Sequence, residues 1–357
     1  MAGKLRMDEI SAKTGYSVST VSRVLSGKAY TSEKARNAIV RCARQLGVLH
    51  DMVSSRLLIN GLVVFAPART FAPRGDHFYL EVTRGIAEAC ASHDVHISYC
   101  PLEEQRADVK LFLEKAGAKS NDAIIIIGTD DQAIFSLAAS LNKPCVLINS
   151  RDKDMKLDAV SPDHHAIGFS AMQHLFEQGH RRVLTVTCLR RETLFLRLEG
   201  IKDAYRHFHL PFSAQKDLIV VEAYSEHETE AALKGWLDEH PREEWPDVIV
   251  PVGKGIITGV QTVLAARSLR IPEDISLMTT DLASQLAGAA GRPVTGFAVP
   301  CRELGYEAIQ LLQNRLNRPH APVYNLLLQA KLIDHGTVAN ATRHAAREEI
   351  RDDQTPA

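Results

Sequence analysis

A short run of small polar side chains with one arginine, Ser17–Arg23, lies near the N-terminus. On a helix that turns 100° per residue, Val18, Ser19 and Arg23 fall within an arc of about 140°. An arginine can contact guanine with two hydrogen bonds, a serine can donate to or accept from several bases, and a valine can pack on a thymine methyl. This pattern predicts a helix face that reads base edges in the major groove of DNA.

The remaining hydroxyl groups of this run suit the DNA backbone. Thr20 and Ser22, together with nearby Lys and Arg side chains, would donate hydrogen bonds to phosphate oxygens. Ser17 comes directly before the helical pattern and is its candidate N-cap. We therefore expect Ser17 and the two further hydroxyls to position the base-reading face on the duplex.

Three short helical patterns place these residues within residues 1–50. The second pattern, residues 18–25, buries Val21, Val24 and Leu25 at i, i+3 and i+4, and Gly27 follows it. The first pattern stops at Gly15 and the third runs from residue 32 to residue 47. Two short helices joined by a tight turn and braced by a third form a helix-turn-helix domain.

The charge of the chain is divided unevenly along its 357 residues. The net charge is −1, with 42 Lys and Arg against 43 Asp and Glu, yet residues 1–60 carry +6 and the remainder carries −7. A basic segment is typical of a nucleic-acid-binding domain. The alternative is a small helical bundle that docks to another protein, and such a bundle does not require a net positive charge. With 45% hydrophobic residues, the whole chain has an ordinary globular composition.

Residues 16–27, Tyr-Ser-Val-Ser-Thr-Val-Ser-Arg-Val-Leu-Ser-Gly, closely resemble the signature of the LacI/GalR transcription regulators. The resemblance continues to Gly47 and, more loosely, to about residue 339. In that family the positions that match Val18, Ser19 and Arg23 read bases. The resemblance implies a homodimeric regulator, most often a repressor. It would bind a near-palindromic operator in double-stranded DNA, and a small-molecule effector would control its affinity for that operator.

Residues 51–60 form a short helical pattern between the head and the body. The resemblance implies a hinge helix here that folds on operator DNA, with Leu57 wedged into the minor groove. The alternative is an ordinary linker that packs Leu57 and Leu58 on the body. His50 stands where the family usually has a proline before the hinge.

Strand-like and helical patterns alternate along residues 61–339, which predicts an α/β fold with parallel sheets. The pattern runs twice, so we expect two Rossmann-like lobes of the periplasmic-binding-protein-like type, with a cleft between them. Lobe 1 is predicted at about 61–161 and 291–322, and lobe 2 at about 162–290 and 323–339. In such folds the ligand binds at the carboxyl ends of the strands. A polar tail, 340–357, follows.

The resemblance also implies an effector site, which we place by matching positions of this sequence to the family pattern. The matching residues are Phe78, Tyr79, Asn149, Arg197, Lys254 and Asp281. Lys254 departs from the family, which usually has an acid there. A lysine in place of a carboxylate favours an anionic ligand, such as a sugar phosphate or a sugar acid. Arg74, Arg151, Arg190 and Arg191 could join it in binding the anion.

Other polar clusters predict structural roles. The sequence Asp163-His164-His165 looks metal-like, but Asp163 is better placed to cap the helix that begins near Ala166. The i, i+2 spacing of His207 and His209 puts them on different helix faces. We expect no metal and no cofactor. The chain has no GxGxxG after a strand, no Walker loop and no GxSxG, so an enzyme is not expected.

The compartment and assembly are predicted from what the sequence contains. Six scattered cysteines without CxxC spacing favour reduced, buried thiols, and the first residues do not form a signal peptide, so we expect a cytosolic protein. No apolar run approaches the length of a membrane span. The tail lacks leucine heptads, which favours a dimer over a tetramer. The alternative function is a small-molecule-binding module or degenerate enzyme whose head docks to protein.

Overall fold

The computed structural model describes residues 2–25, 32–46, 57, 59–71, 77–282 and 293–341. The chain divides into two compact units. One unit contains the chain up to Val160 together with Arg302–Leu326, and the other contains Ser161–Cys301 and the chain from Leu327 onward. Among the described helices, none is both long and apolar enough to span a membrane.

The N-terminal head consists of three helices, α1 (Ala2–Thr14), α2 (Val18–Leu25) and α3 (Glu33–Gln45). Val21, Val24 and Leu25 are buried on α2, so the predicted apolar stripe is confirmed. They pack with Ile10 of α1 and Ile39 of α3 in one small core. The burial of this stripe leaves the opposite face of α2 open to solvent.

Lobe 1 is built on a six-stranded sheet with the order β11-β5-β4-β3-β1-β2. The central strand β3 has the sequence Ala-Ile-Ile-Ile-Ile and is buried on both faces, as expected for a parallel strand covered by helices. Its strands are β1 (Gly61–Ala66), β2 (His96–Pro101), β3 (Ala123–Ile127), β4 (Cys145–Ile148), β5 (Asp158–Pro162) and β11 (Asn325–Leu328); its helices are η1 (Ala68–Phe71), α5 (His77–Cys90), α6 (Val109–Gly117), α7 (Gln132–Ser140) and α13 (Cys301–Asn317).

Lobe 2 repeats this plan with a sheet of order β12-β10-β9-β8-β6-β7. Its strands are β6 (Val183–Cys188), β7 (Leu218–Val221), β8 (Val248–Pro251), β9 (Ser276–Leu282), β10 (Thr295–Ala298) and β12 (Lys331–Ile333). Its helices are α8 (His164–Glu177), α9 (Glu192–His207), α10 (Ala214–Asp217), α11 (Glu226–Glu239), η2 (Arg242–Glu244) and α12 (Lys254–Ala266). The predicted α/β fold of two parallel-sheet lobes is therefore confirmed.

Both sheets place their first strand between the second and the third. β1 pairs in parallel with β2 and β3, and β6 pairs in parallel with β7 and β8. The strand order reverses at β1 and at β6, so the connections that leave their carboxyl ends diverge to opposite faces of the sheet. This divergence opens a space for ligands beside the ends of these strands.

The last two crossings between the lobes differ from the predicted ones. We expected residues 291–322 in lobe 1, but β10 pairs in parallel with β9 of lobe 2. We expected residues 323–339 in lobe 2, but β11 extends the lobe 1 sheet beside β5. Each predicted crossing came one strand too early, because pairing with the open edge of the existing sheet satisfies the backbone groups of these short strands.

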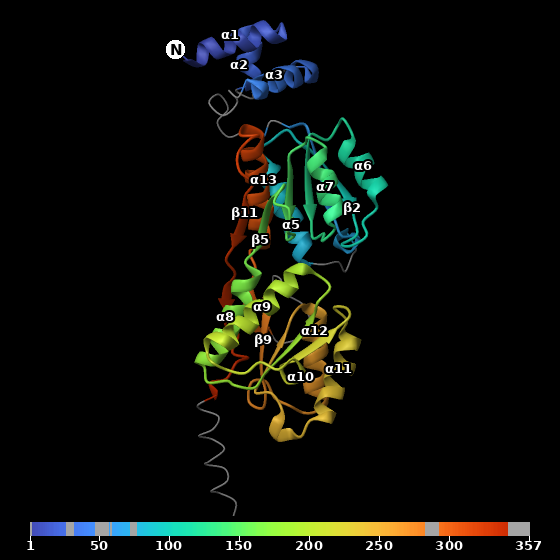
Figure 1. Cartoon of the computed structure of the whole chain (residues 1–357), viewed down its shortest axis with the longest axis vertical. Coiled ribbons are helices and arrows are strands. Elements are labelled where there is room, and N and C mark those ends of the chain that lie inside the picture. Colours follow the sequence, from blue (N-terminus) through green and yellow to red (C-terminus); the bar gives the residue numbers. More distant parts are fainter. Residues whose placement is uncertain are drawn as a thin grey trace, which may run out of the picture. The chain divides into compact units, whose positions relative to one another are not determined.

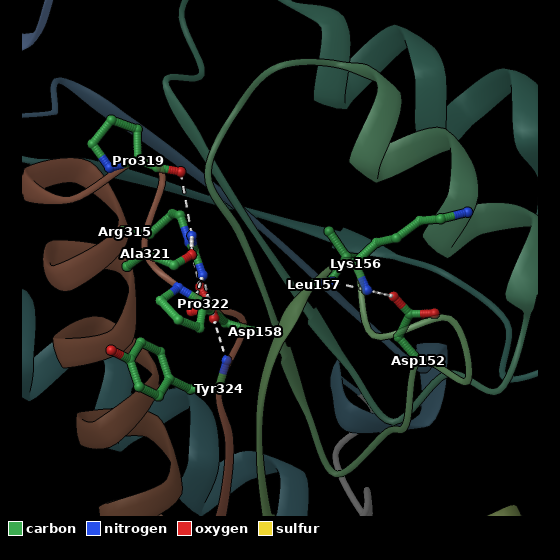
Figure 2. A network of polar contacts seen from close by, with 9 residues as sticks. All are labelled: Asp152, Lys156, Leu157, Asp158, Arg315, Pro319, Ala321, Pro322 and Tyr324. Carbon is green, nitrogen blue, oxygen red and sulfur yellow. Dashed lines mark hydrogen bonds and ion pairs between the residues drawn. The ribbon is translucent and has the colours of Figure 1, made fainter.

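Segments far apart in the sequence meet at the β5 edge of lobe 1, where β11 and α13 lie beside β5 (Figure 1). The buried Asp158 carboxylate accepts hydrogen bonds from Arg315 Nε and Nη2, both at 2.8 Å, and from Tyr324 N at 2.8 Å. Arg315 also donates to the carbonyl oxygens of Ala321 and Pro322 (Figure 2). This network fixes the segment between α13 and β11 against the start of β5.

Candidate functional site

The N-terminus of α2 is capped as its sequence predicts. Ser17 Oγ accepts a hydrogen bond from Thr20 N at 3.2 Å, and Ser17 O accepts the first helical bond from Val21 N. The Thr20 and Ser17 hydroxyl groups lie 2.8 Å apart. The two hydroxyl groups therefore lie together at the end of the helix that would meet a phosphate or a base.

The exposed face of α2 presents Ser19, Ser22 and Arg23, while Val18 and Thr20 are half-buried. Arg23 Nε donates to Ser19 O and Arg23 Nη2 donates to Ser19 Oγ, both at 3.3 Å. The guanidinium thus lies along the helix towards its N-terminal end. The structure places Val18, Ser19 and Arg23 on neighbouring positions of one short helix.

Leu57 is the one predicted DNA-contact residue outside the head. It is 1% exposed, and its backbone N donates to His93 Nδ1 at 3.2 Å. Residues 51–56 of the predicted hinge helix lie outside the described part of the chain. Leu57 is therefore buried against the body, and its insertion between bases stays a prediction.

In lobe 2, the polar candidates gather at the carboxyl ends of neighbouring strands. Arg191 and Arg197 follow β6, Tyr224 follows β7, Lys254 follows β8, and Asp281 lies near the end of β9. Because the strands are parallel, these ends share one edge of the sheet. The reversal of strand order at β6 makes this edge the expected ligand site of the lobe.

Arg197 is buried, at 3% exposure. Its Nη2 lies 2.8 Å from His164 Nδ1, its Nη1 lies 3.4 Å from Thr280 Oγ1, and its closest contact with Asp281 Oδ2 is 3.9 Å. Its Nε has no hydrogen-bond partner among the described residues. Burial lowers the pKa of Arg197, although a guanidinium keeps its charge in proteins.

Arg191 adds a second buried cation at the start of α9, with 2% of its surface exposed. The pKa of His164 lies well below its usual range, first because the ring is buried and then because Arg197 and Arg191 oppose its protonation. Two guanidinium groups therefore act on the same imidazole. The sequence had suggested Arg191 as an additional anion-binding residue, and the structure buries it near this edge.

Lys254 is exposed at the first position of α12. Gly253 before it has φ +101°, and a Cβ there would lie 2.7 Å from the Tyr224 ring. Tyr224 therefore packs against the start of α12.

The lobe 1 candidates lie at the carboxyl ends of its strands and are largely buried. Tyr79 is 3% and Phe78 is 9% exposed, and their rings contact each other edge to face at 5.0 Å. Arg69 lies over the Tyr79 ring at 5.4 Å. Asn149, directly after β4, is buried with φ +53°. The two aromatic residues therefore pack within the lobe, with little ring surface exposed.

Two threonine hydroxyls at the same edge of lobe 1 were missed from the sequence. Thr70 Oγ1 in η1 and Thr129 Oγ1 after β3 are buried and have no hydrogen-bond partner among the described residues. A buried hydroxyl without a partner is costly and suits a site that a ligand completes. Nothing in the local sequence distinguishes these threonines from core threonines.

His164 and Tyr224 were also missed as site residues. The sequence had assigned Asp163 to a helix cap, and Asp163 Oδ1 does accept from Ala166 N at 2.9 Å. The cap fixes the first turn of α8 and so directs His164 towards Arg197. Tyr224 could have been found as an aromatic residue that follows a strand. Within the described residues, no cluster of three His, Cys, Asp or Glu could hold a metal ion. Arg74 lies outside those residues.

Comparisons with known proteins agree with this architecture. Residues 172–338 match the periplasmic binding protein-like domain family. The chain is 25% identical over 336 residues to the HTH-type transcriptional repressor CytR of Escherichia coli (strain K12), covering 93% of this chain and 95% of CytR. It is 22% identical to the ribose operon repressor of Haemophilus influenzae (strain ATCC 51907 / DSM 11121 / KW20 / Rd) over 330 residues, covering 90% of this chain and 95% of that repressor.

A solved structure supports the same fold. A LacI family transcriptional regulator from Enterococcus faecium, with bound ribose, aligns with a TM-score of 0.64 at 19% identity, covering 79% of this chain and 99% of that one. The matches cover nearly the whole length of both curated relatives, which are named as repressors. Over nearly its whole length the chain is therefore similar to repressors and regulators of the LacI type.

Proposed function

We propose that this protein is an operator-binding repressor whose affinity for DNA is controlled by an anionic small molecule, such as a sugar phosphate or a sugar acid. The DNA-binding part rests on the exposed face of α2. The effector part rests on one observation, the buried Arg197 guanidinium whose Nε has no hydrogen-bond partner among the described residues. Each part has a separate experiment, so either can fail without the other.

The α2 face has the chemistry for direct base recognition. Arg23 is exposed and lies along the helix with Ser19, so its guanidinium can reach both acceptors on the major-groove edge of guanine. Ser17, Thr20 and Ser22 would fix the helix on the phosphates. We propose that two heads in a homodimer bind the two halves of a near-palindromic operator, with Leu57 released to enter the minor groove.

A gel-shift titration with the DNA upstream of its own gene tests this assignment. We expect wild type to prefer that DNA over a scrambled duplex, and Arg23→Ala to lose about 1–3 kcal/mol of that preference. Lys13→Ala is the control, because it removes an exposed cation of α1 that pairs with Glu9. If Arg23→Ala keeps the full preference for the upstream DNA, α2 does not read bases there.

The charges at the lobe 2 edge favour an anion. Arg191, Arg197 and Lys254 supply three positive charges at these strand ends, where the carboxylates include Glu222 directly after β7 and Asp281 on β9. Asp281 reaches Arg197 at 3.9 Å, which is too long for a hydrogen bond. A buried guanidinium needs compensating acceptors, and phosphate or carboxylate oxygens bind it with strong charge-assisted hydrogen bonds.

The start of α12 favours an anion for a second reason. Lys254 occupies the first turn of a 13-residue helix, where a positive side chain opposes the helix dipole. Gly253 before it provides no side-chain cap. An anion placed there would interact favourably with both the free N–H groups and the ammonium group.

Lobe 1, taken by itself, has neutral polar groups at the carboxyl ends of its strands. We propose that Asn149, Thr70 and Thr129 of lobe 1 bind hydroxyl groups, since each is a buried polar side chain at the carboxyl end of that sheet. Phe78 and Tyr79 would support this surface from within the lobe. One relative is named for the ribose operon and one similar structure contains ribose, so ribose is the reference ligand for a test.

Calorimetry with D-ribose and D-ribose 5-phosphate separates charge from shape, because the two ligands differ by one phosphate group. We expect the phosphate ester to bind the wild-type protein at least tenfold more tightly. Lys254→Glu should reduce or reverse this ratio, and Lys254→Gln should give an intermediate value. Tight binding of ribose with no binding of its phosphate would overturn the anionic class.

A further inference from the structure

The first turn of α8 faces Arg197. A Cβ at Gly168 would lie 2.1 Å from the carbonyl oxygen of Arg197, and one at Gly200 of α9 would lie 2.0 Å from the carbonyl oxygen of His165. The two helices therefore cross at backbone contact. His164 is four residues before Gly168, so it lies on the same face of α8 and points towards the same part of α9.

The His164 ring is fixed by this crossing in a position to accept a hydrogen bond. Its Nδ1 lies 2.8 Å from Arg197 Nη2, and the two side chains are 6% and 3% exposed. A guanidinium has donors and no acceptor, so Nδ1 must be the acceptor in this pair. The ring is then neutral and carries its proton on Nε2.

A neutral acceptor has a different effect from the carboxylate that usually pairs with a buried arginine. A carboxylate would orient the guanidinium and also cancel its charge. His164 orients it and leaves its charge in place, while the Asp281 carboxylate stays 3.9 Å away. The charged groups that act on His164 are Arg197 and Arg191. The Asp281 carboxylate on β9 contacts Arg197, and Asp163 caps the helix on which His164 lies.

We propose that His164 is a positioning residue of the effector site, which holds Arg197 in place as a neutral acceptor and thereby keeps its charge available for an anionic ligand. This inference rests on the proposed function for the class of ligand. The hydrogen bond between His164 and Arg197 can be tested without any ligand.

Three substitutions of His164 test separately whether the residue orients the Arg197 guanidinium and whether it leaves the charge of that guanidinium uncancelled. His164→Asn puts a neutral oxygen the same number of bonds from Cα as Nδ1, His164→Asp puts a charged oxygen there, and His164→Ala removes the acceptor. The control is His165→Ala, the next residue on α8, whose ring is 46% exposed and pairs with Asp203 at 2.6 Å. All variants are compared as full-length protein, with thermal unfolding as the check that each folds.

Binding of D-ribose 5-phosphate is measured by calorimetry at pH 7.5. We expect His164→Asn and His165→Ala to bind within about threefold of wild type. We expect His164→Ala and His164→Asp to lose about 10- to 100-fold, the range for a hydrogen bond to a charged group. His164→Asp should lose far less affinity for neutral ribose. Folded His164→Ala with unchanged affinity would overturn the proposal, as would folded His164→Asp with tighter phosphate binding.

Nitrogen NMR of the histidine rings tests the pair when no ligand is present. The His164 signals are identified by their loss in His164→Asn. We expect a neutral ring protonated on Nε2 from pH 8 to pH 5.5, with an Nδ1 shift that changes in Arg197→Lys. A ring that titrates near pH 6.5, or carries its proton on Nδ1, would overturn the proposal. If neither sugar binds wild type, the proposed ligand class fails, and the NMR result still decides the role of His164.

Discussion

The charge of the Arg197 guanidinium is only partly balanced by the groups around it. The hydrogen bond that Arg197 donates to His164 has a neutral acceptor, the contact with Asp281 is long, and Arg197 Nε has no partner among the described residues. Removing a charge from water costs several kcal/mol unless other groups compensate it. A ligand that supplies a negative charge would therefore stabilise the folded protein as well as occupy the site.

The buried His164 ring makes the stability of the protein depend on pH. Its folded-state pKa lies well below the ordinary value of 6.5, because of burial and the two nearby arginines. Between these two pKa values the unfolded chain binds a proton that the folded chain does not. The free energy of unfolding should therefore fall as pH drops from 6.5 towards the lowered value, by at most about 1.4 kcal/mol per pH unit from this group.

Urea unfolding at pH 7.5, 6.5 and 5.5 measures this effect. His164→Asn lacks the titrating ring, so we expect its free energy of unfolding to change less over this range than that of wild type. His165→Ala is the matched control, because it removes the next histidine of α8 and leaves the His164 ring in place. If the free energy of unfolding changes equally with pH in wild type and in His164→Asn, His164 is not held neutral by its surroundings.

At the scale of elements, the close crossing of α8 and α9 carries the site. Gly200 allows α9 to approach the His165 carbonyl, and a Cβ would lie 2.0 Å from that oxygen. We expect Gly200→Ala to lower the free energy of unfolding by about 1–3 kcal/mol, since overpacked backbone must move apart. Gly235→Ala in α11 is the control, because its Cβ would meet nothing within 4 Å.

Chemical denaturation compares the two variants directly. Gly235→Ala should be neutral or stabilising by up to about 1 kcal/mol, because alanine is the better helix former. Gly200→Ala should also weaken binding to the effector, since the shift separates His164 from Arg197. A Gly200→Ala protein as stable as Gly235→Ala would contradict the packing described for these two helices.

The buried ion pair at the edge of lobe 1 gives a second test at this scale. Asp158 is 2% exposed and accepts two hydrogen bonds from Arg315 and one from Tyr324 N. Asp158→Asn leaves the Arg315 charge without its partner, so we expect a loss of about 3–5 kcal/mol. Asp154→Asn breaks an exposed pair with Lys156 and should cost about 0–1 kcal/mol. If both variants lose a similar amount of free energy of unfolding, this network has no structural role.

The sequence pattern predicted the alternating strands and helices of the two lobes well, and it placed the short strands at the sheet edges poorly. The strand runs at Gly61 and Ala123 are strongly apolar, and the α2 stripe follows the helical period, so local pattern decides them. β10, β11 and β12 are three or four residues long. Their place depends on which open sheet edge they meet, which is a property of tertiary structure. Both misplaced crossings arise from these strands.

In the candidate site, too, some residues could be found from the sequence and others depend on tertiary structure. Arg197 and Asp281 were found by resemblance, and Arg23 was found from helical geometry. His164 could not be assigned, because its role depends on a helix crossing that brings α8 against α9. Thr70 and Thr129 could not be assigned either, because an unpartnered hydroxyl is recognised only when its surroundings are known.

At the scale of the whole molecule, the uneven charge predicts how the protein meets DNA. Residues 1–60 carry +6 and the rest carries −7, so contact with phosphates is left to the heads. A dimer brings two such heads to one duplex. A protein that neutralises six to ten phosphates loses about 10³ to 10⁵ in affinity between 50 and 200 mM salt.

Fluorescence anisotropy on the upstream duplex and a scrambled duplex, at 50 and 200 mM salt, tests the central claim most directly. We predict that wild type binds the upstream duplex selectively at both salt concentrations, that affinity falls steeply with salt, and that D-ribose 5-phosphate shifts the upstream affinity alone. Equal affinity for the two duplexes, or no binding at 50 mM salt, would contradict the assignment of this protein as an operator-binding regulator.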